Sequence, residues 1–414
     1  MYFRTLLALL SLSLVVPATA KLPIVYSPGY NVNSAPLGRV ASFLLERHPF
    51  DLHKYEKVHA RLCTKLGLTS DDFYTPTPIS RELLLTVHTP HYLDEMLKNQ
   101  ETLAYILEVS KEAGYPLWLN KWLVSFVKKF SIEALEEALL MPAQLAANGT
   151  VIATELAYES GTWAINLGGG YHHAEPENGD GFCVYADAAI AIKQLWLKDP
   201  NLKVMYIDLD AHQGNGVEIC LADELKKENP RLIVFDVYSG NDYPIDFYTF
   251  ADVSQRAYEI RNYIQYDYPL FVDIAHEVYN RPNPVGDALY LPIIRNDLKR
   301  AIETEKPDFI FYNAGTDPYC QDILGKLGLS WEGIMERDYL VWKYAHDNNI
   351  PLVMTLSGGY TRPKTTGAQL ISSSIANCLW WVWQIQPRKL DPKDADYVDC
   401  KNMPEYVKNS LQHS

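Results

Sequence analysis

Two carboxylates and an imidazole lie close together in the segment 206–216, which reads YIDLDAHQGNG. Asp208 and Asp210 are two residues apart after an apolar run, so an extended chain points both to one side, with His212 near that side. Acidic groups on one buried face need a counter-charge. Two carboxylates and one imidazole suit Zn²⁺, and Fe(II) is also compatible with them. The segment therefore predicts a metal site; the alternative is a solvated turn after a strand.

A third carboxylate, Asp317, follows another apolar run in the segment 311–317, which reads FYNAGTD. Together with Asp210 and His212 it makes three ligands and leaves a fourth position open, which is typical of a catalytic rather than a structural metal. Taken alone, Asp317 is equally typical of a helix N-cap. The metal prediction therefore depends on the fold bringing the two segments together.

Two further segments end in residues suited to proton transfer and carbonyl activation. The segment 166–173, NLGGGYHH, ends in His172 and His173, and the ordinary pKa of histidine lies close to neutrality. The segment 355–360, TLSGGY, ends in Tyr360, whose hydroxyl could donate to a reacting carbonyl oxygen. Tyr360 carries little weight alone, because the chain has 28 tyrosines and most of them must be packing residues.

Each of these segments follows an apolar run of strand length, and such runs alternate with amphipathic stretches. This alternation is typical of a parallel sheet covered by helices on both faces. Ligands bind beyond the carboxyl ends of such strands, so the segments should meet at one edge of the sheet. We expect a single α/β domain with strands at 22–26, 163–167, 204–209, 232–237, 309–312 and 352–356, and helices at 90–97, 132–147, 187–197, 293–303, 331–345 and 368–383.

The two ends of the chain differ from its middle. Residues 1–20 combine Arg4, an apolar run too short to span a bilayer, and a small-x-small cleavage site. They predict a signal peptide and an exported protein, periplasmic or secreted, with no membrane span after its removal. We expect a catalytic domain at 21–385, a surface insertion at 239–287 with a helix near 254–263, and a polar tail at 386–414.

The charge balance narrows the range of partners. The chain has 37 basic and 51 acidic residues and a formal charge of −14, which argues against a nucleic-acid-binding surface. Six cysteines are scattered without a Cys-x-x-Cys pair, so no thiolate zinc site is predicted. Their pairing stays open.

The combination of motifs resembles the zinc-dependent histone deacetylases of the arginase–deacetylase fold. The resemblance runs over nearly the whole mature chain and rests on several motifs in order. They are IVYSP at 24–28, HPFD at 48–51, GGGYHH at 168–173, GFC at 181–183, DLDAHQGNG at 208–216, NAGTD at 313–317 and SGGY at 357–360. The HPFD motif, WAIN at 163–166 and HQGNG at 212–216 are most similar to the class IV, deacetylase-11-like branch.

The resemblance assigns roles to the chemical residues. It implies that Asp210, His212 and Asp317 bind zinc and that His172 and His173 form a tandem acid–base pair. The first histidine, or the pair together, would take a proton from water, and the second would protonate the departing amine.

Further residues take supporting roles by the same resemblance. Tyr360 would donate to the substrate carbonyl, and Asp208 would orient His172 and share a K⁺ site with Asp236. Asn215 stands where class I members have an aspartate, which should make His173 easier to deprotonate. The residues expected to line the acyl-lysine tunnel are Tyr171, Gly181, Phe182 and Tyr243.

The implied function is a zinc-dependent amidohydrolase that removes acetyl or longer fatty acyl groups from the lysine ε-amine of proteins or peptides. Export argues against histones as the substrate. Alternatives are a deacetylase of acetylated polyamines or other small amides and a non-catalytic acyl-lysine-binding relative. A two-manganese ureohydrolase would need a carboxylate where Gly214 stands, and a solute-binding protein would show two similar lobes.

Overall fold

The computed structural model describes residues 21–39, 48, 50–106, 125–246, 254–271 and 286–385. The predicted signal peptide and polar tail lie outside the described residues. No helix in the described part is long and apolar enough to cross a membrane, and none of its five cysteines forms a disulfide.

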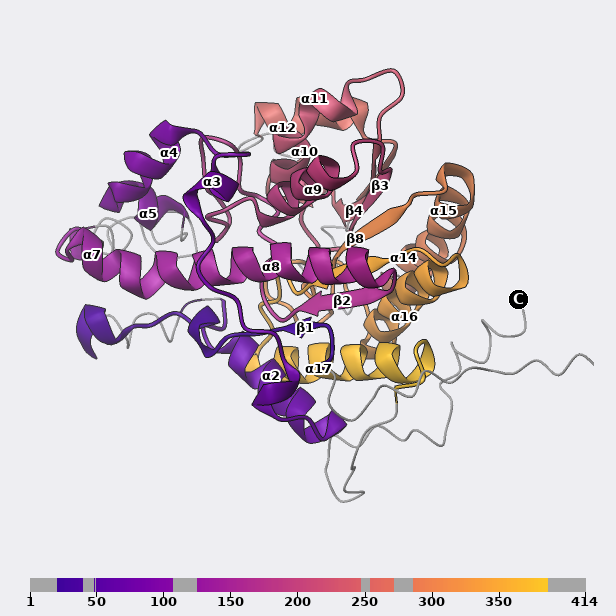
Figure 1. Ribbon diagram of the computed structural model, residues 1–414, viewed down its shortest axis with the longest axis horizontal. Coiled ribbons are helices and arrows are strands. Elements are labelled where there is room, and N and C mark those ends of the chain that lie inside the picture. Colours follow the sequence, from indigo (N-terminus) through magenta and orange to yellow (C-terminus); the bar gives the residue numbers. More distant parts are fainter. Residues whose placement is uncertain are drawn as a thin grey trace, which may run out of the picture.

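A seven-stranded sheet forms the centre of the molecule (Figure 1). Every neighbouring pair of its strands is parallel. The predicted parallel α/β fold is confirmed, with all six expected strands in this sheet. In spatial order the strands are β1 Ile24–Val25, β2 Trp163–Asn166, β9 Leu352–Thr355, β8 Phe309–Asn313, β3 Val204–Asp208, β4 Leu232–Ser239 and β7 Tyr266–Leu270.

Helices cover both faces of the sheet, because its side chains are apolar on both. On β3, Val204 and Tyr206 belong to one buried cluster, whereas Met205 and Ile207 belong to the other. The first face packs against α8 Met141–Ser160 and α9 Asp187–Lys198. The second face packs against α2 Lys54–Leu66, α14 Gly286–Pro292, η7 Ile293–Leu298, α15 Lys299–Glu305, α16 Trp331–Asp347 and α17 Lys364–Trp381.

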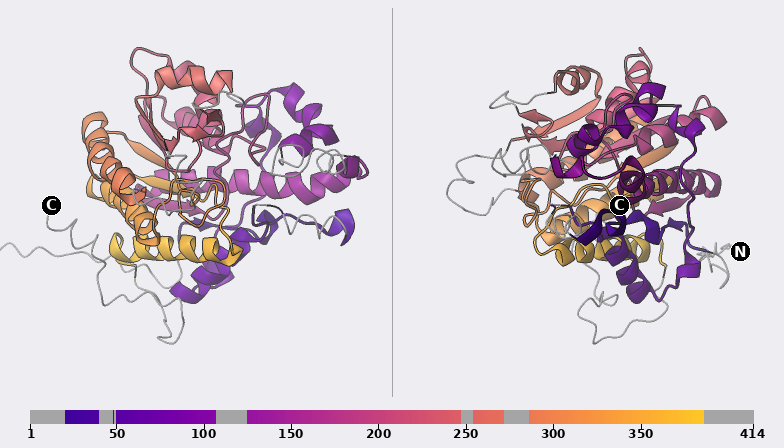
Figure 2. Two further views of the ribbon diagram at one scale, coloured as in Figure 1. Left: turned by 180° about the vertical axis from the view of Figure 1, so that it is seen from behind. Right: turned by 90° about the vertical axis from the view of Figure 1, so that its left-hand side faces the viewer.

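The helices on the second face of the sheet come from both the N-terminal and the C-terminal part of the chain. Helices α2 and α17 lie side by side beneath the sheet in Figures 1 and 2. Shorter elements surround the two layers. They are α3 Arg81–Leu84, α4 Pro90–Asp94, α5 Gln100–Ile106, α7 Ile132–Leu135, η5 Glu136–Leu140, α10 Asn215–Cys220 and α11 Ala222–Leu225.

The segment 239–287 contributes more to the fold than the sequence indicated. Its described part contains a small hairpin, β5 Asn241–Asp242 with β6 Ile245–Asp246, and the expected helix, α12 Gln255–Ile260. It also contains β7, which extends the main sheet at its edge. The apolar pattern missed this strand because Asp267 and Pro269 interrupt it, and edge strands tolerate both residues.

The register of the sheet brings together the segments that carry the candidate site residues. Asp208 at the end of β3 lies opposite Asn313 at the end of β8 and Asp236 on β4. Asn313 in turn lies opposite Thr355 at the end of β9. The loops that follow these strands therefore meet at one edge.

Candidate metal and catalytic site

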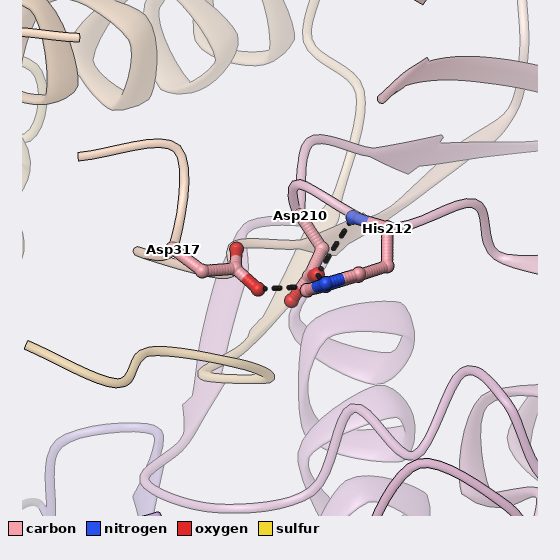
Figure 3. Close-up of side chains that lie close together, drawn as sticks. All are labelled: Asp210, His212 and Asp317. Carbon is pink, nitrogen blue, oxygen red and sulfur yellow. Dashed lines mark hydrogen bonds and ion pairs between the residues drawn. The ribbon is translucent and has the colours of Figure 1, made fainter. Parts of the chain in front are cut away.

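The three predicted metal ligands converge at the carboxyl edge of the sheet. Asp210 and His212 follow β3 and Asp317 follows β8; one ligand atom from each lies within 4.8 Å of the others. The His212 Nδ1 atom is 3.1 Å from Asp210 Oδ1 and 3.0 Å from Asp317 Oδ2 (Figure 3). All three side chains are buried.

Backbone amides hold the two carboxylates in place. The Gly358 N–H donates to Asp210 Oδ2 at 2.9 Å, and the Ala211 N–H donates to Asp317 Oδ1 at 2.8 Å. Asp317 thus keeps Oδ2 for the centre of the site, whereas Asp210 Oδ1 also accepts the His212 N–H at 3.1 Å. The loop after β8 passes so close that a Cβ atom on Gly315 would lie 2.0 Å from Asp210 Oδ2.

The charge of this cluster fits a bound cation. Two carboxylates and one imidazole carry excess negative charge in a site with almost no solvent contact. Burial and the neighbouring Asp210 raise the pKa of Asp317 to about 8, so two ionised carboxylates repel each other here. Oxygen and imidazole ligands in this number suit a divalent ion such as Zn²⁺ with an open coordination position.

The tandem histidines lie beside this centre, but their partners differ. The ring centroids of His172 and His173 are 4.0 Å apart. His172 Nδ1 is 2.9 Å from Asp208 Oδ2, whereas His173 Nδ1 is 2.6 Å from the amide oxygen of Asn215. The first pair includes a carboxylate and the second does not.

This difference in partners gives the two imidazoles different pKa values. Burial lowers the pKa of His172, but Asp208 and Asp210 outweigh it and raise the pKa to about 9. Burial and the neighbouring His172 hold the pKa of His173 well below its ordinary value, since Asn215 offers no compensating charge. His173 is therefore neutral at pH 7.

Tyr360 and three of the four expected tunnel residues, Tyr171, Gly181 and Phe182, border one apolar cavity of about 90 Å³. The Tyr360 ring is buried, with its centroid 6.5 Å from that of His212 and 5.8 Å from that of Phe182. The Tyr243 ring packs edge-on against His173, with 5.0 Å between centroids.

The structure thus brings every predicted site residue to one edge of the sheet, including Asp208 and Asn215. The proposed ion-binding position near Asp236 is adjacent. Its Oδ2 accepts the Gly214 N–H at 2.9 Å, whereas its Oδ1 has no hydrogen-bond partner among the described residues. Burial and Asp208 raise the pKa of Asp236 well above its ordinary value.

Sequence reasoning missed three charged residues, Lys54, Asp187 and Asp322, that hold the loops of the site; Lys54 and Asp187 are buried and Asp322 is partly buried. Lys54 Nζ donates to the carbonyls of Ser357 at 2.6 Å and Gly358 at 2.9 Å. The other two use carboxylates to accept backbone N–H groups. Asp187 accepts from Gly170 and Tyr171, and Asp322 accepts from Tyr360, Leu324 and Gly325.

Comparisons with known proteins agree with this geometry. The histone deacetylase domain family matches residues 48–376. Histone deacetylase 2 of Arabidopsis thaliana is 33% identical over 358 residues, covering 86% of this chain and 79% of that protein. An uncharacterized protein of Picosynechococcus is 27% identical over 340 residues, covering 82% of this chain and 92% of that protein.

Solved structures agree on the fold. An HDAC homologue from Aquifex aeolicus aligns with a TM-score of 0.58 at 17% identity, covering 95% of this chain and 99% of that one. An HDAC homologue complexed with SAHA aligns with the same TM-score at 18% identity.

The sheet and its layers define an arginase–deacetylase fold with a possible metal centre at the strand ends. The chain belongs to the histone deacetylase family, and its activity is of the lysine deacetylase type, a hydrolase.

Proposed function

We propose that this protein is a zinc-dependent lysine deacylase, closest in character to the class IV members of its family. One observation carries the proposal. Three buried ligand side chains converge beside two histidines of unequal pKa, and one of these histidines, His172, lines an apolar cavity together with the buried Tyr360. Metal-assisted amide hydrolysis needs these parts together.

The roles follow from the contacts of each residue. Asp210, His212 and Asp317 would hold Zn²⁺, or Fe(II), which when bound polarises the carbonyl and lowers the pKa of water. His173, neutral and beside this centre, would accept the proton of the attacking water. This assignment reverses the order expected from sequence, because the carboxylate of Asp208 keeps His172 protonated.

The remaining steps use the same groups. The protonated His172 would stabilise negative charge on the carbonyl oxygen, and the Tyr360 hydroxyl would donate to that oxygen. After accepting its proton, His173 would return it to the departing amine. The products are a carboxylate and a free lysine amine.

The cavity favours acyl groups longer than acetyl. A water molecule needs roughly 10–15 Å³ in this measure of volume, and the cavity offers about 90 Å³. Its lining is largely apolar and includes Tyr30, Val32, Leu139, Pro142 and Ala143. An acetyl methyl would leave most of this space unfilled.

Other proposals concern the surroundings of the site. We propose K⁺ near Asp208 and Asp236, since Asp236 keeps an oxygen without a partner among the described residues. The signal sequence at 1–20 supports export, periplasmic or secreted, of a catalytic domain at 21–385. An exported enzyme would act on acylated proteins, peptides or small amines outside the cytoplasm.

The test uses residues 21–414 loaded with Zn²⁺ and matched acetyl-, octanoyl- and myristoyl-lysine peptides. We expect turnover, fastest on a longer acyl group, and a loss of about a hundredfold in Tyr360→Phe, the scale of one oxyanion donor. Tyr344→Phe is the matched control, because that hydroxyl bonds to the Arg295 carbonyl on the surface. Turnover of acetylated polyamines alone would replace the lysine substrate, and absence of metal binding would overturn the proposal.

A further inference from the structure

A buried arginine bridges the two loops that carry the candidate ligands. Arg337 lies on α16 and has no solvent exposure. Its Nη1 donates to the Leu209 carbonyl at 2.9 Å and to the Gly315 carbonyl at 2.7 Å. Leu209 directly precedes Asp210, and Gly315 stands two residues before Asp317.

The two carbonyls lie just beyond the ends of their strands. β3 ends at Asp208 and β8 at Asn313, and the last backbone hydrogen bond between them runs from the Leu209 N–H to the Asn313 carbonyl at 3.1 Å. Beyond it, the Ala211 N–H reaches the Asp317 side chain, and the single guanidinium nitrogen of Arg337 links the backbones of the two loops through the carbonyls of Leu209 and Gly315. Buried carbonyls without a partner would cost free energy, so both loops are drawn to the same atom.

Arg337 is itself held in a fixed orientation. Its Nε donates to Asp338 Oδ1 at 2.8 Å. The hydroxyl of Tyr312, on β8, donates to the same carboxylate oxygen, and that of Ser374, on α17, donates to Oδ2. The guanidinium therefore has a carboxylate partner on one side and the two loop carbonyls on the other.

The ligand geometry is sensitive to the spacing of these loops. Gly315 approaches Asp210 so closely that there is no room for a Cβ atom between them. A shift of the loop after β8 relative to the loop after β3 would displace Asp210 against Asp317. The bridge at Arg337 limits that shift.

We propose that Arg337 is a positioning residue for the metal centre, which sets the separation of Asp210 and Asp317 through the backbone carbonyls of Leu209 and Gly315. The inference rests on the metal site of the proposed function. Groups that orient ligands from outside the coordination sphere typically contribute 10–100-fold to metal affinity. We expect a contribution of this size from Arg337.

Two substitutions test this role. Arg337→Lys keeps the charge but cannot hold two carbonyls and Asp338 with one ammonium. The double variant Arg337→Met with Asp338→Asn removes both charges together, which buried ion pairs often tolerate, and so remains foldable if the single variant is not. Leu340→Ala is the control, because this buried side chain on the same helix contributes to the core and, being apolar, cannot donate a hydrogen bond to either loop carbonyl.

The measurements are the Zn²⁺ dissociation constant, by competition with a chelator, and the visible absorption spectrum of the Co²⁺-loaded protein. We expect at least about tenfold weaker zinc binding and an altered spectrum in both Arg337 variants. Leu340→Ala should lower the melting temperature with affinity and spectrum unchanged.

Wild-type zinc affinity and spectrum in the Arg337 variants would overturn the positioning role and leave a structural one. An equal loss of affinity in Leu340→Ala would also overturn it, since general loosening would then explain the effect. A wild-type protein that binds no zinc would instead refute the proposed function.

Discussion

Two groups of charged side chains are buried next to the same strand ends, and they differ in charge balance. The ligand cluster, Asp210, His212 and Asp317, has two carboxylates and no permanent cation. The support cluster pairs Arg337 with Asp338, and hydroxyl groups and backbone carbonyls supply further hydrogen bonds to the pair. Both groups are essentially free of solvent contact.

This difference in charge balance distinguishes a ligand-binding site from a cluster that only supports the structure. A buried ion pair that is neutral and hydrogen-bonded can stay in the interior without help, although its net contribution to stability is small. A buried cluster with excess charge needs a ligand, as the raised pKa of Asp317 indicates. Burial of charge alone is therefore weak evidence of function, whereas an unbalanced buried charge is strong evidence.

The largest effect is expected from Asp317→Asn. A metal held by this cluster would supply several kcal/mol of transition-state stabilisation, so kcat/KM should fall at least about a thousandfold. In zinc-free protein at pH 7 Asp317 is mostly protonated, because its pKa is raised to about 8, so the isosteric neutral amide should not lower the melting temperature. Activity assays and paired melts with and without Zn²⁺ check both parts. A zinc-free protein that is clearly less stable than wild type would contradict the assigned excess charge.

The opposite outcome is expected in the support cluster. Asp338→Asn leaves the Arg337 charge buried without a counter-ion, and such a change typically costs about 3–5 kcal/mol of unfolding free energy. Urea denaturation of the zinc-free protein measures the loss. A cost below about 1 kcal/mol, the range of exposed pairs, would show that the two clusters do not differ as argued.

A buried histidine that belongs to neither cluster, His88, extends the comparison to a neutral group. His88 Nε2 accepts the Ala186 N–H at 2.9 Å, and burial lowers its pKa from 6.5 to about 4. Between these values the unfolded chain binds a proton that the folded chain does not. The contribution of His88 is therefore complete above about pH 6.5 and is lost as the pH falls towards 4, by about 3 kcal/mol.

The control for this pH dependence is His88→Gln, whose amide oxygen can accept the same hydrogen bond without titrating. Unfolding free energies measured in urea from pH 7 to pH 4.5 should fall less steeply in the variant. Parallel pH profiles would mean that His88 is protonated in the folded protein as readily as in the unfolded chain.

The sequence predicted the ligand cluster because its members follow apolar strand patterns. Asp210 and Asp317 each stand a few residues after such a run, and parallel strands bring their ends to one edge. The edge strand β7 was not predicted, because Pro269 and Asp267 interrupt the apolar pattern. The local sequence pattern was therefore enough to predict the strands that are buried on both faces and the site residues that follow them.

The support residues were not predictable in this way. Lys54 is 303 residues from Ser357, whose carbonyl it holds, and Arg337 is 128 residues from Leu209. Both look like ordinary charged positions on amphipathic helices. Their burial arises only when α2 and α16 pack beneath the strand ends, and no local pattern encodes that contact.

The smallest effect on stability is expected for an ion pair between arginine and aspartate that is exposed to solvent. Arg81 and Asp94 form two hydrogen bonds, of 2.7 and 2.6 Å, with the geometry of a strong ion pair. Their side chains are 47% and 44% exposed, so water solvates either charge when the other is removed. Asp94→Asn should therefore leave the melting temperature within experimental error, in contrast to Asp338→Asn. A comparable loss of stability in both variants would mean that geometry, rather than burial and charge balance, determines what these pairs contribute.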